Sequence, residues 1–406
     1  MTADVDVIVA GGGPVGLAAA IEARLAGLSV VVVEPREGAV DKACGEGLMP
    51  GALPLLARLG VDPAGMPLRG VSYRSPGRRA DHRFANGEGR GVRRTVLQGA
   101  LAERAAELGV QRVVGKVGTV SQDAASVTAG GIRSSWLLGC DGLHSAVRRE
   151  IGVERRASRG RRYGLRQHFR VEPWSDLIEV HWSAGVEAYV TPVDTRTVGV
   201  ALLGRQGMDF ERELAAIEGL EFLGCAERAS ALRGAGSLRQ ATSRRTVGRV
   251  LLVGDASGYV DAITGEGLRL GFAEATAAVA AIAHNTPQRY EQEWSRITRD
   301  FRLLTGGLVG AANSPLRPAI VPLAAALPRV YGAVVERRAR SGACRNRLMR
   351  CRRTTEAAAA ASSVRNRLGR WRAPGRRTSV GACPATPSTR SPSARPPATT
   401  RRAARA

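Results

Sequence analysis

The chain has 406 residues, enough for two hydrophobic cores, and its 44% content of hydrophobic residues is ordinary for a globular protein. Its net charge of +24 would suit a nucleic-acid-binding protein, but residues 337–406 carry +18 of that charge through 19 arginines and a single acid, Glu356. The rest of the chain is close to balanced at +6, so we expect no specific nucleic acid partner.

The first forty residues predict a strand, a glycine-rich turn, a helix and a second strand. The apolar run VDVIVA comes before GGGPVG, an Ala- and Leu-rich helix extends to about Ala26, and SVVVVE follows. This order is typical of the βαβ unit that binds dinucleotides.

Three glycines and one acid in this unit have the spacing of a dinucleotide-binding fingerprint. Gly11 permits a tight turn, Gly13 lets the backbone approach a pyrophosphate, and Gly16 lets the helix pack close to the sheet. Glu34 ends the second strand, where a carboxylate accepts hydrogen bonds from the adenosine ribose. The unit alone does not distinguish NAD from FAD.

The middle of the chain predicts a return to the first sheet and then a separate sheet. A helix is expected from Arg94 to Leu108, and short apolar runs after it predict a β-meander that rejoins the first sheet. From Tyr163 to Leu203, four alternating runs predict a second, antiparallel sheet that forms the floor of a substrate cavity. The chain then returns to the first sheet, enters an Ala-rich helix at Leu268–His284 and continues as proline-broken helices over 286–340.

Two further segments turn the fingerprint into a family resemblance. The sequence GDASGYVDAITGEG, from Gly254 to Gly267, follows an apolar strand and opens a helix, and CDGLHSAVR, from Cys140 to Arg148, follows another strand. With the N-terminal glycines, these motifs in this order resemble the FAD-binding superfamily of flavoprotein hydroxylases, geranylgeranyl reductases and flavin halogenases. The resemblance extends over roughly residues 4–335.

The resemblance implies where FAD would contact the chain. Asp255 would bind the ribityl chain, and the backbone of Gly265–Gly267 would lie beside the pyrimidine edge of the flavin at a helix N-terminus. Asp141 and Gly142 would lie near the pyrophosphate. The expected cofactor-binding residues are Gly11, Gly13, Pro14, Gly16, Glu34, Arg36, Arg94, Gln98, Asp141, Gly142, Asp255, Gly265, Gly267 and Leu268.

Two of these residues are implied by a helix rather than by a glycine motif. Arg94 and Gln98 match the helix whose Arg and Gln reach the cofactor in the hydroxylases. Ser145 and Arg148 would brace the turn that follows Asp141.

The sequence departs from the hydroxylase pattern in two places. Many hydroxylases carry GDAxH with a later proline, whereas this chain has Gly258 and Ala262 at those positions. Its Cys44-Gly45-Glu46 segment is similar to the Cys-Gly-Glu segment of the reductases, and the paired-tryptophan motif of the halogenases is absent. Cys44, with Gly45 beside it, is either a flavin-facing thiol or a small residue that fills space. No other side chain is a catalytic candidate, because the flavin would carry the chemistry, and no metal ligands are expected.

Together the motifs and the resemblance predict an α/β fold. A Rossmann-like FAD-binding domain at 1–160 and 240–285 would be interleaved with an antiparallel-sheet substrate domain at 161–239, to which part of 60–93 is a candidate addition. A helical cap at 286–340 and a disordered basic tail at 341–406 would follow. The tail either binds phosphate or an anionic membrane surface, or is a translated out-of-frame extension.

The six cysteines contain no CxxC pair, no apolar run is long enough to span a membrane, and the N-terminus has no basic leader. We therefore expect a cytoplasmic protein without a transmembrane segment, for which peripheral membrane contact stays open.

The function implied by the resemblance is that of an FAD-dependent oxidoreductase. No second GxGxxG is present, so NAD(P)H would bind only transiently as a co-substrate. The leading expectation is a monooxygenase that uses reduced flavin and O2 to hydroxylate a lipophilic or aromatic, polyketide-like small molecule. The alternatives are a geranylgeranyl-reductase-like saturase of isoprenoid double bonds and a non-catalytic flavin-binding sensor.

Overall fold

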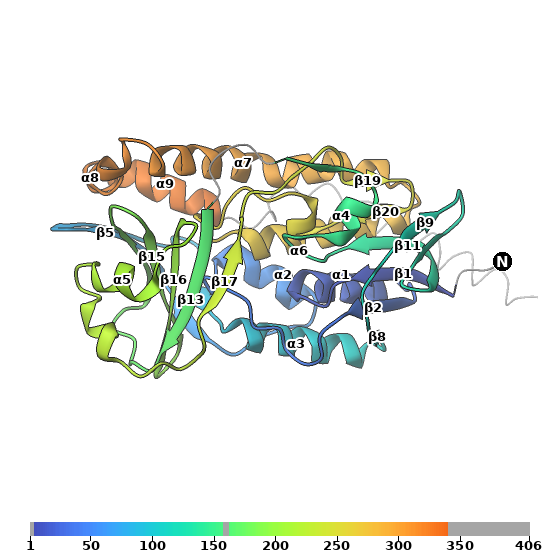
Figure 1. Ribbon diagram of the computed structural model, residues 1–406, viewed down its shortest axis with the longest axis horizontal. Coiled ribbons are helices and arrows are strands. Elements are labelled where there is room, and N and C mark those ends of the chain that lie inside the picture. Colours follow the sequence, from blue (N-terminus) through green and yellow to red (C-terminus); the bar gives the residue numbers. More distant parts are fainter. Residues whose placement is uncertain (1–3, 157–161, 340–406) are drawn as a thin grey trace, which may run out of the picture. The chain divides into compact units, whose positions relative to one another are not determined.

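The computed structural model describes residues 4–156 and 162–339, which are organised around two large sheets (Figure 1). The predicted disordered tail at 341–406 lies outside the described residues. The predicted α/β class is confirmed, because a Rossmann-like sheet with packed helices is joined to a second sheet and a helical C-terminal region.

The first sheet has a parallel core of apolar strands. Its strands, in order across the sheet, are β19 (Thr246–Val247), β20 (Val250–Leu252), β11 (Ile132–Gly139), β1 (Val5–Ala10), β2 (Val30–Glu34) and β8 (Gln111–Val114). All neighbours from β20 to β8 pair in parallel. β9 (Val120–Gln122) and β10 (Val127–Ala129) form the predicted meander beside β11. Every residue of β2 is buried, as expected for a parallel strand covered on both faces.

Three helices surround the glycine-rich turn at the end of β1. α1 (Pro14–Leu25) begins directly after it, with Gly13 as N-cap residue and a proline in the first turn, where the missing N–H leaves no helical bond unmade. α6 (Gly267–Ala283) and α3 (Arg94–Glu107) both pack against α1. These two helices confirm the predictions for Leu268–His284 and Arg94–Leu108 to within a residue at each end.

The second sheet has seven strands from three parts of the chain. In order they are β17 (Arg233–Gly236), β13 (Arg162–Phe169), β16 (Thr197–Arg205), β15 (Glu187–Asp194), β14 (Leu177–Trp182), β5 (Gly70–Ser75) and β6 (Arg78–Arg83). The prediction of an antiparallel sheet is correct for every pair except β14 with β5, which run parallel. β5 and β6 form a hairpin from an earlier part of the chain, so no tight turn connects β5 to β14 or dictates its direction.

The two faces of the second sheet are covered differently. On one face an apolar cluster packs against α5 (Phe210–Ala215). On the other face, a cluster that includes Trp182 packs against α7 (Gln288–Ala312), α8 (Ile320–Ala326) and α9 (Pro328–Ala339). Among the described residues, no single helix has the length and apolar character of a membrane span. Two consecutive helical segments, Arg317–Ala326 and Pro328–Glu336, have that length and composition only when taken together, and they are bent relative to each other.

A small three-stranded sheet lies at the junction of the two large ones. It contains β3 (Gly47–Leu48), β7 (Gly89–Gly91) and β4 (Met66–Leu68). A Cβ on Gly91 would lie 1.7 Å from the carbonyl oxygen of Pro192, so β7 and β15 are in direct backbone contact. The remaining short elements are η1 (Pro50–Ala52), α2 (Leu53–Arg58), α4 (Ala146–Glu150), β12 (Glu154–Arg155), η2 (Glu221–Cys225), β18 (Ala241–Thr242), η3 (Gly254–Ser257) and η4 (Arg317–Ala319).

Candidate cofactor and active site

The turn between β1 and α1 has the close contacts of a dinucleotide-binding turn. Gly11 adopts a φ of +102°, and a Cβ there would lie 2.7 Å from the carbonyl oxygen of Cys140. A Cβ on Gly16 would lie 1.9 Å from the carbonyl oxygen of Gly11, so α1 reaches the sheet only with glycine at this position. At Gly13 the nearest atom to a Cβ would be Arg94 Nη2 at 3.8 Å, which leaves room beside the free N–H groups that begin α1.

Glu34 lies buried at the end of β2, next to this turn. Its Oε2 accepts a hydrogen bond from the Gly12 N–H at 2.8 Å, and its Oε1 accepts one from Arg36 Nε at 2.6 Å. Burial alone would raise the pKa of Glu34, but the hydrogen bonds from Arg36 and Gly12 outweigh burial and lower that pKa. The carboxylate therefore stays ionised, and its remaining lone pairs are available to ribose hydroxyls.

Arg94 and Gln98 lie one turn apart on α3 but have different surroundings. Gln98 is almost fully buried; its Nε2 donates to the Gly12 carbonyl at 2.7 Å and its Oε1 accepts from the Val40 N–H at 2.7 Å. Both ends of the amide thus contact the protein, so Gln98 positions the glycine-rich turn. Arg94 Nε, in contrast, is buried and has no hydrogen-bond partner among the described residues.

Positive charge gathers beside the turn. Lys42 has a pKa lowered by desolvation and then by repulsion from the charges of Arg36 and Arg94. Its Nζ lies 4.0 Å from the position that a Cβ on Gly142 would occupy. Three cations near a helix N-terminus suit a pyrophosphate, which would relieve their mutual repulsion.

The Asp141 turn supplies one more unmatched polar atom. Asp141 Oδ2 accepts hydrogen bonds from the N–H groups of Ala146 and Val147 at 2.7 and 3.1 Å, whereas its buried Oδ1 has no partner among the described residues. Ser145 caps α4 by accepting from the Arg148 N–H at 2.9 Å, and the buried Arg148 guanidinium donates to the Leu143 carbonyl at 2.8 Å. Ser145 and Arg148 therefore brace this turn internally.

Asp255 lies in η3, directly after β20. Burial raises the pKa of its carboxyl group, against the charges of Arg94, Lys42 and Arg148, which favour the ionised form. Within the described residues its carboxylate accepts no hydrogen bond, so it can accept from a ligand hydroxyl. Gly265 has a φ of +69° and no atom within 4 Å of a Cβ, whereas a Cβ on Gly267 would contact the Tyr259 ring at 3.4 Å.

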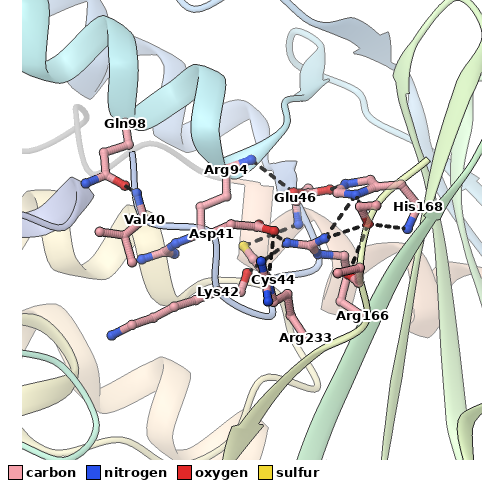
Figure 2. Close-up of polar contacts among 12 residues, drawn as sticks. Val40, Asp41, Lys42, Cys44, Glu46, Arg94, Gln98, Arg166, His168 and Arg233 are labelled. Atoms are coloured by element: carbon pink, nitrogen blue, oxygen red, sulfur yellow. Dashed lines mark hydrogen bonds and ion pairs between the residues drawn. The ribbon is translucent and has the colours of Figure 1, made fainter. Parts of the chain in front are cut away.

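Residues 40–46 form a loop that connects the cofactor side to the second sheet; Figure 2 shows its polar contacts. Glu46 adopts a φ of +58°, which is unusual for a residue with a side chain. Its Oε1 accepts from the Arg94 N–H at 2.9 Å, and its Oε2 lies 2.6 Å from His168 Nε2 on β13. Both side chains are buried, so Glu46 fixes the start of α3 to the second sheet.

A second connection runs parallel to the first. Arg166, also on β13, forms an ion pair with Asp41 and donates to the Lys42 carbonyl at 3.2 Å. Ser230 Oγ lies 2.9 Å from His168 Nδ1, which fixes the imidazole from its other side. The loop is therefore held at both ends by β13 (Figure 2).

Cys44 and Gly45 lie between these two connections. The Cys44 Sγ accepts a weak hydrogen bond from the Glu46 N–H at 3.4 Å, and Thr191 donates to the Gly45 carbonyl at 2.9 Å. Burial raises the pKa of Cys44, so its thiol stays protonated near neutral pH. This environment favours the space-filling interpretation of Cys44 over a reactive thiolate.

A buried charge network lies on the face of the second sheet that contacts the loop at 40–46. Arg162 and Arg317 both pair with Glu187, and Arg162 Nε lies 3.7 Å from Asp261 Oδ2. The Tyr189 hydroxyl donates to the Ile263 carbonyl at 2.8 Å. These contacts position the segment that leads into Gly265.

Sequence reasoning assigned no site role to Lys42, Arg166 or His168, and it noted Glu46 only as part of a family segment. One local signal was available: Glu46 stands between two glycines, a setting typical of a backbone with positive φ. Its pairing with His168 depends on residues 122 positions apart, which no local pattern reveals.

The comparisons with known proteins agree with this geometry. Residues 4–189 match the family model described as FAD binding domain. A dialkyldecalin synthase of Streptomyces rugosporus is 31% identical over 305 residues, which cover 66% of this chain and 63% of that protein. A rifampicin monooxygenase of Streptomyces venezuelae is 30% identical over 306 residues, which cover 66% of this chain and 62% of that protein.

The fold is also found among solved structures. A geranylgeranyl bacteriochlorophyll reductase-like protein from Thermoplasma acidophilum aligns with a TM-score of 0.67 at 20% identity, over 82% of this chain and 91% of that chain. This likeness shows the fold. The chain spans about three fifths of the length of the two curated relatives.

Proposed function

We propose that this chain is an FAD-dependent monooxygenase of the FAD-binding superfamily that its motifs resemble, because residues 4–189 match the FAD binding domain model and a rifampicin monooxygenase is 30% identical over 66% of the chain. Its substrate is a lipophilic or aromatic, polyketide-like small molecule, with O2 as oxidant and NAD(P)H as transient co-substrate. The similarity to a protein named rifampicin monooxygenase supports this reaction class.

The polar atoms without partners around the glycine-rich turn carry this proposal. Arg94 Nε and Asp141 Oδ1 are buried without partners among the described residues, and there is room beside Gly13. Native proteins rarely leave such atoms unpaired unless a ligand or water completes them. Their arrangement beside a helix N-terminus and three cations fits an adenosine diphosphate unit, so the described residues fit FAD.

Each of these groups has a task in holding the cofactor and its charge. Glu34 binds the adenosine ribose, while the N-terminus of α1 and the cations Arg94 and Lys42 balance the pyrophosphate. Asp255 orients the ribityl chain, and the N-terminal end of α6 after Gly265 stabilises negative charge beside the ring. FAD, when bound, supplies the redox chemistry by accepting hydride from NAD(P)H and reacting with O2.

The second sheet separates the reaction from water. The loop at 40–46 is held between α3 and β13 by buried pairs, and the Tyr189 side chain fixes the segment before Gly265. A closed, preorganised wall of this kind limits loss of electrons to solvent.

The experiment has two stages. First, cofactor released from the purified protein is identified by chromatography; FMN alone, or no flavin after reconstitution, contradicts the proposal. Second, NAD(P)H oxidation is measured with a panel of oxygenated aromatic compounds under ¹⁸O2, and mass spectrometry should find one ¹⁸O atom in the product. A substrate that is reduced without ¹⁸O incorporation contradicts oxygenation.

A second candidate function is double-bond reduction, for which the Cys44-Gly45-Glu46 segment is the specific observation. This segment lies beside Arg94 and is similar to the reductase segment. Under anaerobic conditions a reductase saturates its substrate with dithionite-reduced protein, whereas a monooxygenase does not turn over. A protein that binds flavin but gives no substrate-dependent NAD(P)H oxidation is instead a sensor.

A further inference from the structure

A large cavity lies at an end of the second sheet, formed by none of the residues assigned to the cofactor. It is bounded by the β5–β6 turn, the β14–β15 turn, the loop after α5 and the start of α8. Its volume is about 730 Å³, which is in the range of small-molecule sites in proteins.

The wall of this cavity combines apolar surface with arginine. The apolar part includes Trp182, Ile217, Pro318, Val321 and Pro322. Four arginines also line it, Arg74, Arg78, Arg79 and Arg317, whereas Glu218 is the only acidic residue of the lining. Such a wall suits a molecule with an apolar body and a negative group.

The arginines differ in what they already bind. Arg74, Arg79 and Arg317 pair with Glu179, Asp81 and Glu187, which lie outside the lining. The Arg78 side chain is exposed and makes no hydrogen bond or ion pair with the described residues. It can therefore bind a ligand without breaking an existing ion pair of the fold.

Two residues of the lining, Trp182 and Arg317, also carry buried donors that have no acceptor within the part of the chain that the structure describes. The Trp182 side chain is buried, with 5% of its surface exposed, and its Nε1–H has no acceptor among the described residues. Arg317 Nη2 is likewise buried without a partner, and its guanidinium carbon lies 5.5 Å from the centre of the Trp182 ring. An indole or guanidinium N–H can only donate, so whatever completes these groups must supply acceptor oxygens.

We propose that this cavity is a binding site for an apolar small molecule that carries an anionic oxygen group, such as a carboxylate. The oxygens accept hydrogen bonds from Trp182 and Arg317 and attract Arg78, while the apolar body packs on Val321 and the prolines. A plain hydrocarbon chain would leave the buried donors unsatisfied and does not belong to this class. The site is independent of the proposed reaction.

The test compares two fluorescent probes on the FAD-bound protein. 1-Anilinonaphthalene-8-sulfonate carries a sulfonate, and N-phenyl-1-naphthylamine has the same aromatic body without it. We expect the sulfonate to bind on the order of tenfold more tightly, as a charge-assisted hydrogen bond predicts. Trp182→Phe, which removes the N–H but keeps an aromatic ring, and Arg78→Gln should each remove most of that advantage and leave the neutral probe unchanged.

Arg83→Gln is the matched control, because Arg83 lies on the same strand as Arg78, is exposed and does not line the cavity. It should bind both probes as the unmodified protein does. Flavin absorbance and melting temperature verify that each variant is folded. Equal affinity for the two probes, or an advantage that survives both Trp182→Phe and Arg78→Gln, overturns the proposal, and neither result bears on FAD binding or O2 chemistry.

Discussion

Among the proposed cofactor residues, Asp255 has the side chain with most to gain from a ligand. Its carboxylate lies among Arg94, Lys42 and Arg148 and accepts no hydrogen bond within the described residues. We expect Asp255→Ala to weaken FAD binding by about tenfold to a hundredfold, because a charge-assisted hydrogen bond is lost in a buried site. Asp255→Asn keeps one acceptor and should lose less. Fluorescence quenching of FAD titrated into apoprotein measures both, and equal, wild-type affinities would place the ribityl chain elsewhere.

The buried pair of His168 and Glu46 predicts a stability effect. His168→Leu would leave the Glu46 carboxylate without its 2.6 Å donor, and a hydrogen bond to a charged group contributes about 1.5–3 kcal/mol. His168→Gln keeps a donor and should cost less. Urea denaturation compares the free energies of unfolding of the two variants. Identical midpoints would mean that the hydrogen bond from the Arg94 N–H is enough to stabilise the buried Glu46 carboxylate.

At the scale of elements, the contact between α1 and β1 predicts opposite effects for two Gly→Ala substitutions. Gly16→Ala would place a methyl group 1.9 Å from a backbone oxygen, so α1 must move, and both FAD binding and stability should fall. A Cβ on Gly99 of α3 would have no neighbouring atom within 4 Å, so Gly99→Ala should stabilise the helix by about 0.5–1 kcal/mol, because alanine has the higher helix propensity. Thermal unfolding and FAD titration of both variants test the pair. A harmless Gly16→Ala would refute the close packing of α1.

The connection between α6 and η3 predicts a pH effect. Burial raises the pKa of Glu274 to about 8 from 4.5, although its carboxyl group accepts hydrogen bonds from the Gly254 N–H and the Ser257 hydroxyl. Between pH 4.5 and about pH 8 the native state therefore binds more protons than the unfolded chain. The contribution of Glu274 to stability is complete below pH 4.5 and is lost as pH rises through about 8.

Glu274→Gln keeps an acceptor oxygen but cannot ionise. Its free energy of unfolding should rise relative to that of the wild type as pH increases from about 4.5 to about 8, as measured by urea denaturation across this range. Glu103→Gln, at an exposed position of α3, should follow the wild-type curve. Parallel curves for all three proteins would show that Glu274 titrates normally.

For the whole molecule, the pairs that hold the loop at 40–46 predict cooperative unfolding of the described residues. Arg166 with Asp41, and His168 with Glu46, connect the second sheet to the segment beside the cofactor. Loss of the second sheet should therefore release FAD in the same transition. The melting midpoints from flavin fluorescence and far-UV circular dichroism should coincide; two separated transitions would show that the sheets unfold independently.

Sequence reasoning predicted local features well and long-range contacts poorly. The glycine spacing and Glu34 follow from chain-local physics, so the β1–α1–β2 unit could be derived without a structure. The contacts of Gln98 with Gly12 and Val40 could not be predicted, because these partners are brought to it only by the fold. The parallel pairing of β5 with β14 was missed for the same reason, since strand direction across a sheet is set by the topology of the whole chain.

That pairing also has a consequence for synthesis. A ribosome completes the β5–β6 hairpin about ninety residues before β14, so the edge of β5 stays unpaired until β14 emerges. An unpaired strand edge is a template for intermolecular association. The arginines of β6 discourage such pairing only at the outer edge of the sheet, so they do not protect the edge of β5 that awaits β14. Shortened chains that end before β14 would keep that edge permanently open, so they should aggregate even though their glycine-rich turn is intact.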